Sequence, residues 1–217
     1  MPRRSPWLTL IAGAAVLAVL AVLFLRSVRS TRAAPFAVER DSLAGWTLVP
    51  QPASDAQGSW LALRPPERLT PPLGREIFRR GAESLTFPTP PLLPLLLQRE
   101  FDRAFAGAVM PEAILSLARA AAFESATLTP RCMGYRRVSE PGATRTVYFL
   151  LFDAPPFEQF RQALSELVRA EGGDPLLFDP AALSPVLIVA AADGDFDRWM
   201  PLRADPGVDC LAPVEVR

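Results

Sequence analysis

An uninterrupted apolar run near the N-terminus constrains this chain more than any other feature of its sequence. Trp7–Leu25 spans nineteen residues without a charge. As an α-helix rising ~1.5 Å per residue, it would cover about 28 Å, close to the ~30 Å hydrocarbon thickness of a bilayer. Trp7 suits a membrane interface, and arginines stand on both sides of the run. The run predicts a transmembrane helix that anchors the chain from Trp7 to Leu25.

A cleaved signal peptide is the main alternative for this run. The apolar region of a signal peptide typically has only ~7–15 residues and ends at a small-residue cleavage site, whereas this run is longer and Arg26 follows it directly. These features favour an uncleaved signal-anchor, and the pair Arg3 and Arg4 leaves a twin-arginine export signal as a further alternative. A short N-terminal tail commonly stays inside. We therefore expect a single-pass protein of the bacterial inner membrane whose main domain is periplasmic.

The side chains available for catalysis are few. All 23 basic residues are arginine, and the chain contains no lysine, histidine or asparagine. Such a chain has no Ser-His or Cys-His nucleophile, no imidazole base or ligand, no Schiff base and no P-loop lysine. Two distant cysteines cannot make a four-thiolate zinc site. The sequence therefore predicts no cofactor and no metal, and it favours a protein that is not an enzyme.

A hydrolase that uses two carboxylates is the enzymatic alternative that this composition leaves. Its acid and base would come from residues such as Glu76, Glu83, Glu100 and Asp102, in the manner of glycoside hydrolysis. Most of these carboxylates alternate with arginines. That alternation is typical of an exposed helix surface with ion pairs.

The chain beyond the apolar run is mildly acidic. Residues 33–217 contain 18 arginines against 23 carboxylates, a net charge of −5. Nucleic-acid binding depends on neutralising phosphates with basic groups. We expect no nucleic-acid partner. The expected partners are the lipid bilayer, through the N-terminal helix, and a protein of the envelope.

The sequence predicts four consecutive parts. They are a short tail (1–6), the transmembrane helix (7–25), a basic tether (26–35) and a single α+β globular domain (36–217). The 24 prolines are spread through the chain and alternate with dense Leu, Val and Phe clusters. This distribution favours an ordered, loop-rich domain over disorder.

The first half of the domain reads as short strands followed by helices. Strands are expected at 46–50 and 59–63, and Thr70 with two prolines begins a helix that turns Leu73, Ile77, Phe78 and Leu85 inward. Leu93, Leu97, Phe101 and Phe105 recur every four residues, so 87–107 is predicted to be a second helix. A third helix begins near Pro111.

The second half shows the clearest pattern. Strands at 131–138 and 144–152 flank a Pro141-Gly142 pair that suits a type II turn, which predicts a β-hairpin. A helix after Asp153, a strand at 185–191, a short helix containing Trp199 and a strand near 210–216 follow. The order is β-β-α-β-α-β. It predicts an α+β domain with a mainly antiparallel sheet covered by helices.

The two cysteines allow two interpretations. In an exported domain Cys132 and Cys210 can form a disulfide, which would close a loop of 78 positions (210 minus 132). Alternatively, both are buried free thiols, because a single pair has no diagnostic spacing.

Three further clusters are candidate sites. Arg131, Arg136, Arg137 and Arg145 concentrate on the predicted hairpin and could contact an anion or a partner, or form a solvated edge against aggregation. The run Leu92–Leu97 could contact a partner or the bilayer, although core burial is favoured. Asp193, Asp195 and Asp197 have calcium-loop spacing, but the rest of that motif is absent and helix capping explains them better.

We expect a membrane-anchored, non-catalytic accessory or scaffold protein that binds other components of a bacterial envelope assembly. The anchor, the short tether and the lack of catalytic side chains support this hypothesis. One alternative is a module in which the hairpin arginines and the apolar 92–97 region bind a lipid or another anion. The other is the carboxylate-based hydrolase.

Overall fold

The computed structural model of the chain describes residues 17–24, 26, 33–52, 58–81, 84–126 and 128–217. They belong to two compact units, Met1–Ala34 and Pro35–Arg217. In the first unit, residues 17–24 are helical and exposed. Most of the predicted transmembrane helix, Trp7–Leu25, lies outside the described residues. Within the described ranges, no helix combines the length and the apolar character needed to cross a membrane.

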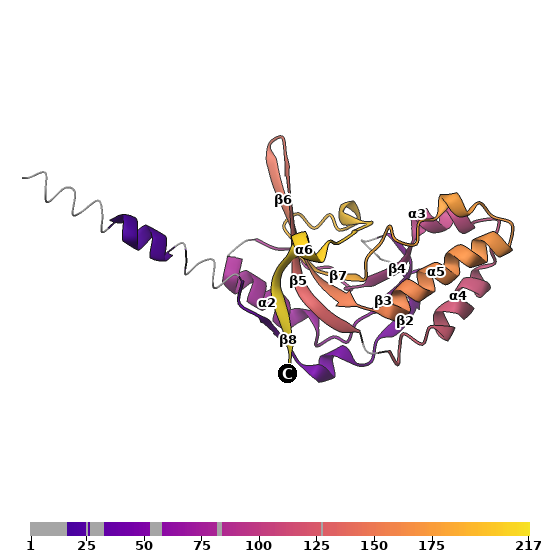
Figure 1. The fold of residues 1–217 in the computed structure, drawn as a ribbon, viewed down its shortest axis with the longest axis horizontal. Coiled ribbons are helices and arrows are strands. Elements are labelled where there is room, and N and C mark those ends of the chain that lie inside the picture. The colour runs from indigo at the N-terminus through magenta and orange to yellow at the C-terminus, as the bar shows by residue number, and fades with distance from the viewer. Residues whose placement is uncertain (1–16, 25, 27–32, 53–57, 82–83, 127) are drawn as a thin grey trace, which may run out of the picture. The chain divides into compact units, whose positions relative to one another are not determined.

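The second unit is an α+β domain with two sheets (Figure 1). The larger sheet has the strand order β1-β8-β5-β6-β7, and all its pairs are antiparallel except β1 with β8. The smaller sheet has the order β2-β3-β4 and is antiparallel throughout. The strands are β1 (Phe36–Val38), β2 (Thr47–Pro50), β3 (Ser59–Arg64), β4 (Leu93–Leu97), β5 (Thr129–Glu140), β6 (Ala143–Asp153), β7 (Val186–Ala191) and β8 (Cys210–Val216).

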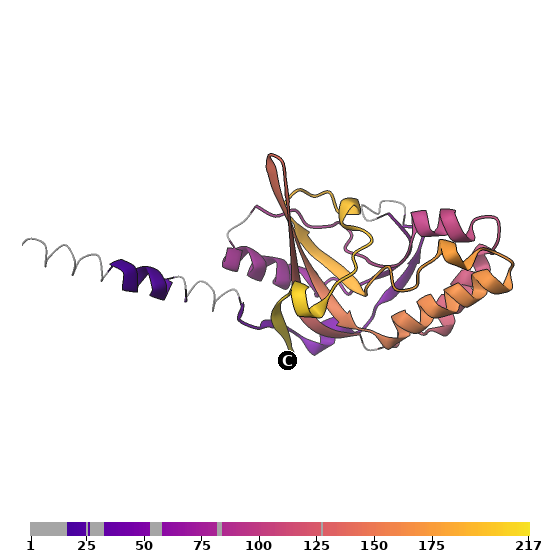
Figure 2. The ribbon, with the colours of Figure 1, turned by 45° about the horizontal axis from the view of Figure 1, so that its top comes forward.

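Helices flank both sheets, and α4 and α5 lie together at the end of the domain opposite α2 in both views (Figures 1 and 2). The α-helices are α2 (Thr70–Gly81), α3 (Gln98–Glu100), α4 (Pro111–Ala120), α5 (Pro155–Ala170) and α6 (Pro206–Asp209). A π-helical turn, Phe101–Phe105, continues α3, and 3₁₀ turns occupy Arg40–Leu43, Pro175–Leu177 and Asp197–Trp199. Buried residues of both sheets and of the helices form one hydrophobic cluster. The predicted α+β class with a mainly antiparallel sheet is confirmed.

The predicted hairpin is β5 and β6, and its strands are longer than expected. Gly142 has a φ of 84°, which the third position of a type II turn requires. The two strands pair as far as Glu140 with Ala143, whereas β8 leaves β5 at Gly134 and β7 leaves β6 at Val147. The outer part of the hairpin is therefore a two-stranded arm, which extends away from the sheet in Figure 1.

The helix predicted for 87–107 is wrong in its first half. Leu93–Leu97 is strand β4, and helix begins only at Gln98. All five residues of β4 are buried, which a short strand inside the core achieves and an amphipathic helix does not. Pro94 lacks an N–H, and β4 is an edge strand of its sheet, so a proline is tolerated there. The expectation that Leu92–Leu97 is buried in the core holds.

The predicted helix after Asp153 is α5, and it buries a continuous hydrophobic face, whereas α2 buries only part of its predicted inner face. In α5, the hydrophobic residues Phe157, Phe160, Leu164 and Val168 are buried. In α2, Leu73 and Ile77 are buried, but Phe78 is 57% exposed. Phe78 follows Ile77 directly, so it projects about 100° further round the helix and leaves the buried face.

Candidate binding groove

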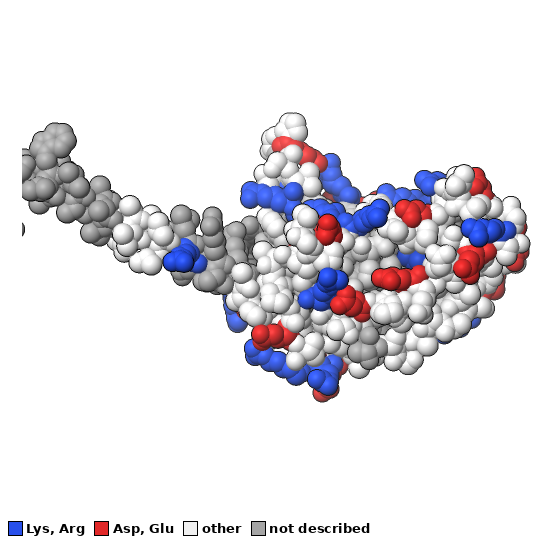
Figure 3. All heavy atoms as spheres, viewed as in Figure 1, with Lys and Arg blue, Asp and Glu red and all other residues white. Residues whose placement is uncertain are grey.

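The hairpin arginines do not form one shared anion site, because three of them pair with carboxylates of this chain. Arg137 is exposed and makes no hydrogen bond or ion pair with another described residue. Figure 3 shows basic and acidic side chains interspersed on the face that carries the hairpin. The paired atoms are Arg131 Nη1 with Asp153 Oδ1 at 3.3 Å, Arg136 Nη2 with Asp209 Oδ2 at 2.6 Å, and Arg145 Nη1 with Asp193 Oδ2 at 2.6 Å.

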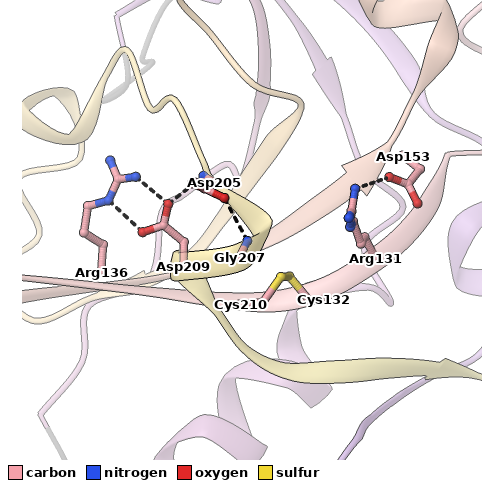
Figure 4. Close-up of a disulfide and its surroundings, with 8 residues drawn as sticks. All are labelled: Arg131, Cys132, Arg136, Asp153, Asp205, Gly207, Asp209 and Cys210. Carbon is pink, nitrogen blue, oxygen red and sulfur yellow. Dashed lines mark hydrogen bonds and ion pairs between the residues drawn. A yellow bond between two sulfur atoms is a disulfide. The ribbon is translucent and has the colours of Figure 1, made fainter.

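The pair of Arg136 and Asp209 is the most structured of these contacts (Figure 4). Arg136 donates to both carboxylate oxygens of Asp209 and to the backbone oxygen of Arg203. Asp209 also accepts a hydrogen bond of 2.8 Å from the backbone N–H of Asp205. Burial acts to raise the pKa of Asp209, but these hydrogen bonds outweigh it and lower that pKa. The pair joins β5 to the end of α6, directly before β8.

The contribution of Arg136 to the stability of the fold depends on pH, because its partner Asp209 titrates. A carboxyl whose pKa is lowered by folding stabilises the fold above its unfolded pKa of about 3.9, and that contribution disappears as pH falls through the folded pKa. We expect Arg136→Gln to lower the free energy of unfolding at neutral pH, and the deficit to shrink below about pH 4 as Asp209 is protonated. Denaturant-induced unfolding of the wild type and the variant at a series of pH values measures this difference in the free energy of unfolding. Arg137→Gln, which changes an exposed neighbour with no partner among the described residues, is the control and should show no such trend. A deficit of Arg136→Gln that stays constant into acid contradicts the prediction.

A disulfide joins Cys132 to Cys210, next to this ion pair in the chain (Figure 4). Cys132 belongs to β5 and Cys210 begins β8, and their Cα atoms are 5.7 Å apart. The two strands are neighbours in the larger sheet, with Cys132 opposite Pro213. The bond therefore links adjacent strands that are far apart in sequence.

The carboxylates considered for a hydrolase are occupied by partners in this chain, as far as they are described. Glu76 pairs with Arg80 at 2.9 Å, and this hydrogen bond lowers the pKa of Glu76, whereas a general acid needs a raised one. Asp102 accepts from Gln98 Nε2 at 2.8 Å. Glu83 lies outside the described residues. The described residues also contain no cluster of three or more acidic or cysteine side chains that could hold a metal ion, and Asp193 instead accepts a hydrogen bond from the backbone N–H of Asp195.

Glu100 belongs to a buried ion pair that the sequence analysis missed. Arg161 of α5 is fully buried, and its Nη2 lies 2.7 Å from Glu100 Oε1. The guanidinium also donates to the backbone oxygens of Leu95, Asp179 and Pro180. A signal was available, because Arg161 stands four residues after Phe157 and next to Phe160, within the apolar stripe of the helix. This pair attaches α5 to β4 and α3.

A cavity with a volume of about 1210 Å³ lies between α2 and the 84–91 segment. We call it the α2 groove. Phe87 packs over Gly74 of α2, in space that any Cβ at that position would occupy. Phe78 stands one helical turn further along α2, and Val189 of β7 also lines the cavity. Its apolar lining includes Pro71, Phe78, Leu85, Phe87, Pro88 and Val189.

Basic side chains surround this apolar lining. Among the described residues, Arg64, Arg75 and Arg79 line the groove together with one carboxylate, Glu67. Arg79 pairs with Glu76 at 3.4 Å, whereas Arg64 and Arg75 are exposed and make no hydrogen bond or ion pair with another described residue. The groove therefore combines an apolar floor with cationic groups that are open to an anion.

The sequence analysis did not find this groove, because residues from β3, α2, the 84–91 segment and β7 meet only in the folded chain. The available signal was Gly74 within the apolar periodicity of α2, since an internal helix glycine often marks a close approach. The arrangement can bind an elongated apolar group with an anionic end, but it holds no paired acid and base for catalysis among its described residues. No protein-family model, curated protein or solved structure matches this chain.

Proposed function

We propose that this protein is a membrane-anchored, non-catalytic accessory protein of the bacterial envelope that binds another envelope component in the α2 groove. The observation that carries the proposal is the exposure of Phe78 and Phe87, 57% and 47%, on the two sides of one cavity. Contiguous apolar surface of this kind in a soluble domain marks an interaction site. Among the described residues of Pro35–Arg217, no other phenylalanine is exposed to this degree.

Three features support the membrane location and the outer side. The apolar run Trp7–Leu25 has the length of a membrane span. The tether that follows it is short and rich in arginine, as expected next to a bilayer surface. The disulfide between Cys132 and Cys210 is typical of a domain that folds in an oxidising compartment such as the periplasm.

Site-specific photo-crosslinking tests the groove as the binding surface. The full-length chain, expressed in bacterial membranes, carries a photo-crosslinking phenylalanine analogue in place of Phe78. We expect a dominant adduct of defined mass from this position, because the side chain faces the groove that the partner fills.

The matched control places the same analogue at Leu176, which is 87% exposed and lies outside the groove. Both variants carry a bulky aromatic group on the surface, so non-specific hydrophobic association should affect them equally. The same adducts from both positions, or none from position 78, would show that the groove is not a binding surface.

A further inference from the structure

The backbone of the groove does not suit a peptide that binds by extending a sheet. A peptide that extends a sheet needs free backbone N–H and C=O groups on its receptor. The N–H and the C=O of Thr86 already bond to Ala191 of β7, at 2.7 and 2.9 Å. Prolines, which lack the N–H group, occupy five of the lining positions: Pro65, Pro71, Pro88, Pro90 and Pro91.

The apolar part of the lining suits a hydrocarbon chain. Phe78, Phe87, Leu85 and Val189 offer carbon surface that makes no demand for hydrogen bonds. The volume of about 1210 Å³ exceeds the ~300–1,000 Å³ that small-molecule sites commonly have, so a long and flexible group can be accommodated. These residues indicate that one part of the ligand is hydrophobic.

The arginines indicate the charge of the other half. Arg64 and Arg75 are two guanidinium groups without a partner among the described residues, and both line the groove. A guanidinium binds phosphate or carboxylate oxygens through paired N–H donors. Three arginines and one carboxylate, Glu67, are among the described lining residues, and this balance favours an anion.

The position of α2 in the chain connects this chemistry to the membrane. Arg80 at the C-terminal end of α2 donates to the backbone oxygen of Pro35 at 2.8 Å, and its guanidinium covers the ring of Phe36. Leu25 and Pro35 are ten positions apart. Ten residues extend over at most ~36 Å, so chain length alone would hold Pro35, the residue that Arg80 contacts, within that distance of the end of an inserted Trp7–Leu25 run.

We infer that the α2 groove binds an anionic phospholipid of the membrane, with an acyl chain along Phe78 and Phe87 and the phosphate at Arg64 and Arg75. This inference rests on the proposed function, because it names the envelope component that the groove takes. Charge complementarity and the ten-residue connection to the apolar run are its grounds. The connection to the apolar run favours a membrane lipid over a free metabolite of the same charge.

Photo-crosslinking from the lipid side tests it. The full-length chain is placed in nanodiscs of phosphatidylcholine that contain a minor fraction of phosphatidylglycerol with a photoactivatable acyl chain. We expect lipid adducts on peptides from 71–91. Arg64→Gln/Arg75→Gln should lower their yield at least about tenfold, because charge-assisted contacts with a phosphate are each worth about that factor.

Arg137→Gln/Arg169→Gln is the matched control. It removes two exposed arginines without described partners outside the groove, so the net charge changes equally. Its adduct yield should stay at the wild-type level. An equal loss in both double variants would mean that the bilayer surface attracts the domain by charge alone, which overturns the inference.

The two proposals fail in distinguishable ways. If position 78 gives a protein adduct in native membranes while nanodisc lipids label nothing in 71–91, the groove binds a protein, and only the phospholipid inference is overturned. If neither experiment labels the groove, both proposals fall. Labelling by photoactivatable phosphatidylcholine as strong as by phosphatidylglycerol would overturn the role assigned to Arg64 and Arg75.

Discussion

Arg161→Ala is expected to lower the free energy of unfolding by about 3–5 kcal/mol, because it removes one partner of a buried ion pair. Arg161 is fully buried, and Glu100 retains only 14% of its side-chain exposure. Without the guanidinium, the Glu100 carboxylate loses its charged partner, and the backbone oxygens of Leu95, Asp179 and Pro180 each lose a hydrogen bond. Denaturant-induced unfolding of the full-length chain measures the loss.

Arg169→Ala is the control for this experiment. Arg169 lies on the same helix, is exposed, and makes no hydrogen bond or ion pair with another described residue, so its removal should cost less than about 0.5 kcal/mol. Arg161→Lys keeps the charge but not the planar fork of donors, and we expect an intermediate loss. Equal stability of the two alanine variants would show that the buried pair contributes nothing to the fold.

Removing the disulfide is expected to cost about 4 kcal/mol, because the bond restricts the unfolded chain. Cys132 and Cys210 are 78 positions apart, so the reduced chain gains the freedom of a long loop when it unfolds. The variant Cys132→Ala/Cys210→Ala should unfold at a lower denaturant concentration than the oxidised wild type. The reduced wild type should match the variant closely.

The chain supplies its own control, since these are its only cysteines. A reductant should shift the unfolding midpoint of the wild type and leave that of the double variant unchanged. Non-reducing electrophoresis of protein taken from cells tests the same bond where the protein functions. A wild type whose mobility and unfolding midpoint are indifferent to reductant would refute the prediction.

Elements with local determinants were predictable from the sequence. The Pro141-Gly142 turn specifies the β5–β6 hairpin because the positive φ at Gly142 is a property of that residue itself. The 3.6-residue periodicity of Phe157, Phe160, Leu164 and Val168 predicts α5 without information from distant residues. In both cases, residues close in the chain carry enough information.

Features that depend on distant residues were not predictable. A short continuous apolar run such as that of β4 is compatible with a buried strand and with a buried helix. Which of the two forms is decided by pairing with β3, about thirty residues earlier in the chain. The α2 groove needs Arg64, Phe87 and Val189 to meet. Three of the four hairpin arginines form ion pairs with acids such as Asp209 and Asp193, which only the fold brings close to them.

The first and last strands of the domain are direct neighbours. β1 and β8 run parallel, and the backbone N–H of Arg40 bonds to the oxygen of Arg217, while the N–H of Arg217 bonds to the oxygen of Val38. The two ends of the domain's chain therefore lie side by side, as in a ring with a single gap. Anything joined to Arg217 therefore emerges beside the strand with which the domain begins, and a short linker could close the ring.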